Sequence, residues 1–368
     1  MGSDFDQSLR YEEQFHSTQD RKFFKKERKE ASLKDRSKYK KSDQKNQEKP
    51  SYKPPSDQEK EGKVLAIYPE AILVDSEGVL YQCQLKGSLK KEKHKAKNLV
   101  AVGDLVLFEQ REPTTGLIVA VQPRYSVLSR ADNLLRHKEQ LIAVNIDQVI
   151  ITTSVHSPSL KPSLIDRYII ACQKGNLSPV IVINKIDLLD LVEDEEKKLA
   201  LCCQHEYQKL GIPCLFISIK TGEGLHELKE LMHKKTSVFS GQSGVGKSSL
   251  INAVLGAALK TGDIVHKTLK GSHTTTTTHL IPLEGGGFCV DTPGIKSFGV
   301  WDLEEKEIQD YFSEIAQMAK LCKFTTCSHT NEPCCAVLLA LEQGEISTMR
   351  FASYLSLLET AGKKHQHR

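Results

Sequence analysis

A glycine-rich octapeptide constrains the fold of this chain more than any other stretch. It spans 241–248 with the sequence Gly-Gln-Ser-Gly-Val-Gly-Lys-Ser, after an apolar run at 237–240 and before a helical pattern that reaches Leu255. The order of strand, glycine turn and helix is typical of a phosphate-binding loop, whose backbone N–H groups face the phosphates. In such a loop Lys247 bridges the outer phosphates and the Ser248 hydroxyl binds magnesium, whereas an ordinary glycine turn would leave both residues unexplained. The residues predicted to contact the nucleotide here are Gly241, Gln242, Ser243, Gly244, Val245, Gly246, Lys247, Ser248 and Ser249.

A guanine-reading motif lies upstream of this loop. Asn184, Lys185 and Asp187 belong to an NKxD turn that directly follows an apolar run at 179–183, which is predicted to be a buried strand. In such a turn the Asp carboxylate accepts two hydrogen bonds from guanine N1 and N2, the Asn contacts the base, and the Lys stem packs along its plane. Adenine lacks that pair of donors, so it would leave Asp187 desolvated and unpaired. The motif therefore predicts that the nucleotide is GTP or GDP.

A second loop, at 218–224, is expected to wrap the guanine one strand and one helix later, with contacts from Ser218, Ile219 and Lys220. Both guanine motifs precede the phosphate loop, whereas in ordinary GTPases the phosphate loop comes first. Such a circular permutation is tolerated because the same sheet can be assembled from either end when the termini lie close together. The last motif of the domain then leads directly into the C-terminal region, so loss of the γ-phosphate is expected to move that region.

The remaining GTPase elements follow the phosphate loop. Asp291 and Gly294 enclose a DxxG turn, in which the Asp orients magnesium through water and the Gly N–H senses the γ-phosphate. Upstream of it lies a threonine-rich segment that begins at His273, and one of its threonines would complete the magnesium shell. The predicted magnesium ligands are Ser248, Thr274, Thr275 and Asp291. A run of threonines can also be a strand edge, and its last residues are expected to lead into a strand that reaches Pro282.

Apolar periodicity predicts three kinds of architecture along the chain. Short alternating runs at 63–68, 71–75, 78–85, 103–108 and 116–121 indicate a five-stranded barrel, and the nucleic-acid-binding OB-fold is the expected type. Strands at 148–154, 179–183 and 213–217 alternate with helices at 163–174, 193–210 and 224–233, which predicts a parallel sheet covered on both faces. From Leu303 onward the pattern is helical apart from a cysteine cluster.

Composition changes sharply at the start of the barrel. The first 60 residues have few aliphatic side chains and are predicted to be disordered. Residues 21–53 contain 14 basic and 5 acidic residues, a charge that suits an RNA backbone, although a solubilising tail fits equally well. The lysine-rich loop at 86–97 is a second predicted RNA contact, or an ordinary solvated loop. No run approaches the roughly 18 apolar residues of a membrane helix and no signal peptide is evident, so we expect a cytoplasmic protein without a membrane partner.

The cysteine cluster predicts a structural metal site. Cys322, Cys327, His329 and Cys335 supply three thiolates and an imidazole over a short stretch, which suits tetrahedral zinc without an open position. The adjacent Cys334 is an alternative ligand, and free surface thiols are the alternative interpretation. We therefore expect four parts: a disordered basic tail over 1–60, an OB-fold barrel over 61–130, a circularly permuted P-loop GTPase domain over 131–302 and a helical zinc-binding domain over 303–368.

The combination of permuted motifs with a preceding barrel and a following cysteine knuckle resembles the bacterial RsgA (YjeQ) family of small ribosomal subunit biogenesis GTPases. The resemblance runs from about residue 62 to the C-terminus and includes short motifs at 103–106 and 123–130. It implies a zinc-binding GTPase that docks on the small ribosomal subunit late in its maturation, contacts ribosomal RNA through the barrel and the knuckle, and leaves on subunit-stimulated GTP hydrolysis. The chain departs from the family in its longer basic tail and in Ser272, where a basic residue or Gln is common.

The group that positions the attacking water does not follow from the usual motif. Ile295 comes after the DxxG turn, where a Gln is frequent, and it cannot hydrogen-bond. His273 is the candidate, acting together with Lys247, although a purely structural histidine also fits. A GTP-gated RNA-binding module with incidental hydrolysis is the alternative function, and a P-loop kinase is a third that would lack a guanine reader. We expect a monomer with one structural Zn²⁺ and with Mg²⁺ bound alongside GTP.

Overall fold

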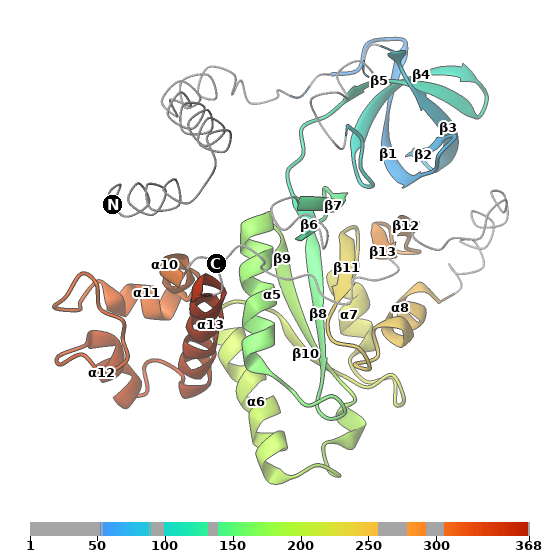
Figure 1. Ribbon diagram of the computed structural model, residues 1–368. Coiled ribbons are helices and arrows are strands. Elements are labelled where there is room, and N and C mark those ends of the chain that lie inside the picture. The colour runs from blue at the N-terminus through green and yellow to red at the C-terminus, as the bar shows by residue number, and fades with distance from the viewer. Residues whose placement is uncertain are drawn as a thin grey trace, which may run out of the picture. The chain divides into compact units, whose positions relative to one another are not determined.

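The computed structural model describes residues 54–87, 99–131, 139–256, 278–291 and 305–366, together with residues 52 and 89. These residues form a small barrel, an α/β sheet and a group of C-terminal helices (Figure 1). The predicted tail over 1–60 and the lysine-rich loop lie largely outside the described residues. Within the described ranges, no helix has both the length and the apolar character that crossing a bilayer requires.

The expected five-stranded barrel is confirmed, with strand ends that differ from the predicted ones by a few residues. Its strands are β1 (Glu59–Ile67), β2 (Ile72–Ser76), β3 (Val79–Leu85), β4 (Leu105–Glu112) and β5 (Thr115–Val121). Because β1 pairs with both β2 and β4, the sheet closes on itself in the order β1-β2-β3-β5-β4. The pair β3 and β5 is parallel and the other pairs are antiparallel. The interior is filled by Val64, Ile72, Val74, Tyr81, Cys83, Val106, Phe108 and Ile118.

The predicted parallel sheet follows the barrel. Its strands are β8 (Gln148–Ser154), β9 (Ser178–Asn184), β10 (Cys214–Ile217), β11 (Thr236–Ser240), β12 (His279–Pro282) and β13 (Phe288–Asp291). They lie in the order β10-β9-β8-β11-β13-β12, and β12 is antiparallel to its neighbour. A separate hairpin of β6 (Val127–Ala131) and β7 (Glu139–Val144) was not predicted, because both strands are short and contain polar residues.

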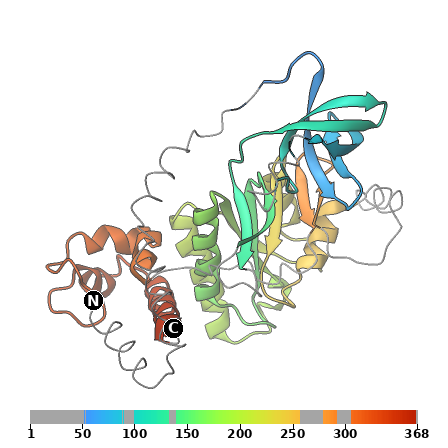
Figure 2. The ribbon, with the colours of Figure 1, turned by 45° about the horizontal axis from the view of Figure 1, so that its top comes forward.

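Helices cover both faces of this sheet, as the alternation predicted. They are α5 (Pro162–Gly175), α6 (Asp194–Lys209), α7 (Leu225–Met232) and α8 (Lys247–Leu255), and a single turn, η1 (Ile186–Leu188), follows β9. On β8, Val149 and Ile151 belong to the core shared with α5 and α6, whereas Ile150 belongs to the core shared with α7 and α8. Figures 1 and 2 show the two pairs of helices on opposite sides of the strands. Burial on both faces explains why these strands are continuous apolar runs.

Two short motifs noted in the sequence meet where the chain leaves the barrel: one lies at the start of β4 and the other follows β5. Arg124 donates from Nε and Nη2 to the two carboxylate oxygens of the buried Asp104, over 2.8 and 2.9 Å. Gly103 has φ +93°, and a Cβ at this position would lie 1.9 Å from the carbonyl oxygen of Val144 on β7. A glycine is required there by close backbone contact. The 103–106 and 123–130 motifs therefore stabilise the connection between the barrel and the hairpin.

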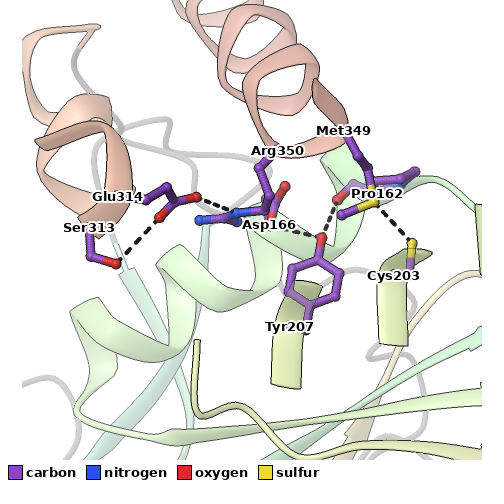
Figure 3. Close-up of polar contacts among 8 residues, drawn as sticks. All are labelled: Pro162, Asp166, Cys203, Tyr207, Ser313, Glu314, Met349 and Arg350. Carbon is purple, nitrogen blue, oxygen red and sulfur yellow. Dashed lines mark hydrogen bonds and ion pairs between the residues drawn. The ribbon is translucent and has the colours of Figure 1, made fainter. Parts of the chain in front are cut away.

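The C-terminal helices are anchored to α5 and α6 by a buried polar network (Figure 3). They are α10 (Glu305–Ile308), η2 (Gln309–Tyr311), α11 (Ser313–Ala319), α12 (Ala336–Glu342) and α13 (Thr348–Gln366). Arg350 on α13 donates to Asp166 on α5 and, from Nε, to Glu314 on α11 over 2.7 Å. The Tyr207 hydroxyl on α6 donates to the same Asp166 oxygen over 2.9 Å. Burial raises the pKa of Asp166, and the charge of Arg350 acts in the opposite direction.

Replacing Arg350 by Met is expected to lower the free energy of unfolding by about 3–5 kcal/mol, because it leaves the buried Asp166 without its cationic partner. Arg111→Met is the matched control. Arg111 lies 2.7 Å from Glu109, but its side chain is 60% exposed, so we expect its loss to cost less than about 1 kcal/mol. Urea unfolding monitored by circular dichroism compares the two variants. Equal losses would contradict a stabilising role for the buried network.

Candidate nucleotide site and metal centre

The predicted nucleotide motifs all follow the carboxyl ends of parallel strands in the sheet. The parallel strands β9, β10 and β11 end at Asn184, Ile217 and Ser240, directly before the NKxD turn, the 218–224 loop and the phosphate loop. Open α/β sheets bind ligands in the crevice along this edge. Helix α8 begins directly after the glycine turn, so its unpaired N-terminal N–H groups lie at the same edge. The arrangement suits an anionic ligand.

The NKxD turn, predicted to read guanine, contacts the glycine-rich loop directly. Asn184 donates from Nδ2 to the Val245 carbonyl over 2.8 Å, and its side chain is almost fully buried. The next loop residue, Gly246, has φ +96°, and a Cβ there would lie 2.4 Å from Asn184 Nδ2. A side chain at this position would therefore push the two motifs apart. Asn184 Oδ1 is buried and accepts no hydrogen bond from the described residues.

The 218–224 loop orients Asp187, the second side chain predicted to contact guanine. Ser218 is fully buried, and its hydroxyl donates to Asp187 Oδ1 over 2.7 Å. Lys220 Nζ lies 4.0 Å from Asp187 Oδ2, and the side chain of Asp187 is 16% exposed. Ile219 is partly buried against the core below α7 and α8. The carboxylate is therefore oriented by the loop and still accessible, as a reader of guanine requires.

Two lysines of the site donate to backbone carbonyls. Lys247 Nζ donates to Gly241 over 2.8 Å and to Gln242 over 2.5 Å, which places its ammonium over the start of the phosphate loop. Lys185 has φ +65°, and its Nζ donates to the carbonyl of Ser157. Ser157 lies in the loop after β8, which the sequence motifs did not indicate. Its proximity follows from the strand order, because β8 lies between β9 and β11.

The other predicted nucleotide contacts are only partly covered by the described residues. Ser248 and Ser249 lie in the first turn of α8, and Ser243 and Gly244 lie in the turn before it. Asp291 ends β13, where its backbone is paired, and its side chain is not described. His273, Thr274, Thr275 and Gly294 lie outside the described residues.

The cysteine cluster forms a compact donor set. The ligand atoms of Cys322, Cys327, His329 and Cys335 all lie within 4.8 Å of one another. Nδ1 of His329 is 3.4 Å from Cys335 Sγ and 3.6 Å from Cys322 Sγ, and these two sulfurs are 3.8 Å apart. Usual zinc bond lengths in a tetrahedron separate two sulfurs by about 3.8 Å and a sulfur from a nitrogen by about 3.6 Å. The four residues fit one tetrahedral metal ion, and the exposed Cys334 lies outside the cluster.

The pKa shifts of Cys322 and His329 favour their metal-binding forms, whereas that of Cys327 does not. Burial acts to raise the pKa of Cys322, but the backbone N–H groups of Val337 and Ala336 and the neighbouring thiols outweigh it, so this pKa is lowered. The thiolate is the form that binds metals. Burial lowers the pKa of His329, which favours the neutral imidazole. Burial raises the pKa of Cys327 to about 12, so metal binding at this thiol would release a proton.

Comparison with known proteins identifies relatives along most of the chain. The family model for the RsgA GTPase matches residues 121–301. The chain is 40% identical over 298 residues to the small ribosomal subunit biogenesis GTPase RsgA of Chlorobaculum parvum, covering 78% of this chain and 94% of that protein. It is 38% identical over 287 residues to the RsgA of Flavobacterium psychrophilum, covering 77% and 87%.

Solved structures agree with this similarity. YjeQ from Thermotoga maritima superposes with a TM-score of 0.66 at 31% identity, covering 82% of this chain and 98% of that one. YloQ, described as a circularly permuted GTPase, superposes with a TM-score of 0.64 at 26% identity, covering 84% and 96%. The predicted permutation agrees with these neighbours, since β9 with its NKxD turn precedes β11 and the phosphate loop. The chain therefore belongs to the RsgA GTPase family.

Proposed function

We propose that this chain is a GTPase that assists the assembly of the small ribosomal subunit. The observation that supports this most directly is the hydrogen bond from Asn184 to the carbonyl of Val245, because it joins a guanine reader and a phosphate loop in one site. Asp187, oriented by Ser218, supplies the second contact to guanine. The names of the relatives, which span most of this chain, extend the proposal from GTP to the ribosome.

The proposed reaction is attack of water on the γ-phosphorus, with GDP as the leaving group. Lys247 neutralises the charge on the phosphates, while the backbone N–H groups of the loop and of α8 hold them in place. The proposed base contacts are Asn184, Lys185, Asp187, Ser218, Ile219 and Lys220. The proposed magnesium ligands are Ser248, Thr274, Thr275 and Asp291, the last through water. When bound, Mg²⁺ supplies further charge neutralisation at the phosphates, and Gly294 is proposed to sense the γ-phosphate.

The parts outside the GTP site are proposed to bind the ribosome. A closed five-stranded barrel supports an OB-fold that contacts ribosomal RNA, and the Cys₃His cluster is proposed to hold Zn²⁺ in a knuckle that also contacts RNA. The proposed domain limits are 61–130 for the barrel, 131–302 for the GTPase domain and 303–368 for the zinc domain, after a basic tail over 1–60. We propose that the protein acts in the cytoplasm as a monomer, late in subunit maturation.

Cosedimentation with purified subunits tests the partner and the timing. We expect binding to the small subunit with a non-hydrolysable GTP analogue, much weaker binding with GDP, and little binding to the large subunit in either state. We also expect the small subunit to stimulate GTP turnover, since its binding is proposed to position the threonine-rich segment and the DxxG turn at the γ-phosphate. Strong binding with GTP and an unchanged turnover rate would instead favour the GTP-gated RNA-binding module.

The base reader is tested by Asp187→Asn. We expect the affinity for GDP to fall by about 100-fold or more, because the amide can no longer accept both guanine hydrogen bonds and leaves a polar group mismatched. Affinity for xanthosine diphosphate should rise, since its second carbonyl can accept from the amide. Asp190→Asn is the control, because the side chain of Asp190 is 92% exposed. Calorimetric titration measures both nucleotides. An unchanged preference for GDP would contradict the assignment.

The water-positioning role proposed for His273 is tested by His273→Ala. We expect GTP affinity to be retained and subunit-stimulated turnover to fall by about 100-fold, the usual contribution of one positioned acid or base. Ser272→Ala controls for disturbance of the same segment. Single-turnover phosphate release on the small subunit separates the chemical step from product release. Unchanged release would remove His273 from the mechanism and leave it a structural residue.

A further inference from the structure

The histidine of the metal cluster has two ring nitrogens in different surroundings. Nδ1 of His329 faces the sulfurs of Cys335 and Cys322 at 3.4 and 3.6 Å. Nε2 points away from the cluster and lies 2.9 Å from Oε1 of Gln309. The residue is 1% exposed, so water has little access to either nitrogen. The ring is therefore held between the thiols on one side and an amide on the other.

A carbonyl oxygen beside Nε2 selects one tautomer. Oε1 of Gln309 can only accept a hydrogen bond, so Nε2 of His329 must be the protonated nitrogen. In the neutral ring the lone pair then lies on Nδ1, which is the nitrogen that faces the thiols. Metal-ligating histidines commonly donate their other N–H to such an acceptor, which fixes the ring and raises its basicity.

Gln309 does not belong to the segment that contains the ligands. It begins η2, directly after α10, and neighbouring residues on both sides contact α5 of the GTPase sheet. Glu307 forms an ion pair with Lys174 on α5 at 3.0 Å, and Lys174 Nζ also lies 5.8 Å from the centre of the Tyr311 ring. The side chain of Gln309 therefore reaches the cluster from a short segment that is held against the GTPase helix.

We propose that Gln309 is a positioning residue for the metal centre. Gln309 accepts the hydrogen bond from Nε2–H of His329 and directs Nδ1 toward the metal position. The short segment formed by α10 and η2 thereby becomes part of the metal site. The inference rests on the proposed zinc centre. Nothing in the spacing of the cysteines indicated this residue, because it lies before the first of them in the chain and on a different element.

The zinc affinity of the full-length protein tests this role. Competition with a chromophoric chelator measures the affinity, and mass spectrometry determines the metal content. Gln309→Leu removes the acceptor and is expected to weaken zinc binding by about 10–100-fold. Gln309→Glu keeps an acceptor at this position and is expected to retain affinity close to that of the unmodified protein. Gln317→Leu is the matched control, because Gln317 is an exposed glutamine on the neighbouring α11. A residue that only fills space would lose affinity equally with Leu and Glu, or with neither.

The outcomes separate this inference from the proposal on which it rests. A protein without one tightly bound zinc would overturn the zinc centre itself, and the role of Gln309 with it. A protein that binds zinc normally, with Gln309→Leu and Gln317→Leu of equal affinity, would overturn only the role of Gln309. If the leucine variant does not fold, Gln309→Asn withdraws the oxygen by one methylene and is expected to weaken zinc binding in the same direction. Absorption of the Co²⁺-substituted protein reports whether the tetrahedral ligand field is disturbed.

Discussion

The register of three neighbouring parallel strands, β9, β8 and β11, is the constraint on which the proposed nucleotide site depends. In the ladder, Ser154 at the end of β8 pairs with Asn184 at the end of β9, and β11 follows on the other side of β8. Neighbouring strands are about 4.8 Å apart, so β9 and β11 are separated by about 10 Å. Strand β11 ends beside Ile151, and the phosphate loop then starts close to Thr152 of β8, since a Cβ on Gly241 would lie 2.0 Å from the Thr152 carbonyl oxygen. From there the loop brings the Val245 carbonyl within 2.8 Å of Asn184 Nδ2. The middle strand contributes no motif, but it sets the distance between the two that do.

The permuted chain order changes which parts of the molecule are connected covalently, but it leaves the sheet contacts in place. Strand β13, which ends at the first residue of the DxxG turn, is followed in the chain by the C-terminal helices. Those helices pack on α5, where Arg350 pairs with the buried Asp166. Helix α5 in turn packs on β8 and β9, whose carboxyl ends lie at the proposed nucleotide site. The C-terminal part is therefore joined to the GTPase sheet both along the chain and through a buried ion pair.

Much of this arrangement could be predicted from the sequence, because the relevant patterns are local. The strand and helix runs have clear periodicity, and the glycine, NKxD and cysteine motifs each specify chemistry within a few residues. The contacts that were missed depend on pairing between distant segments. Examples are the position of Ser157 beside Lys185, the ion pair of Arg350 with Asp166, and the contact of Gln309 with His329. No spacing within one segment indicates which strand lies between two others or which helix covers a buried carboxylate.

The C-terminal helices do not form their apolar core alone. Their apolar core includes Ile170 from α5, so it is completed by the GTPase part. Small domains bury a lower fraction of their surface than large ones, and they often depend on a metal or on a partner surface for stability. Here the Cys₃His cluster lies at one side of this small core, and the Arg350 network lies at its contact with α5 and α6. The stability of the part that contains the Cys₃His cluster and its attachment to the GTPase sheet are therefore linked properties. A change at the proposed nucleotide site that displaces α5 would disturb a core that both parts share.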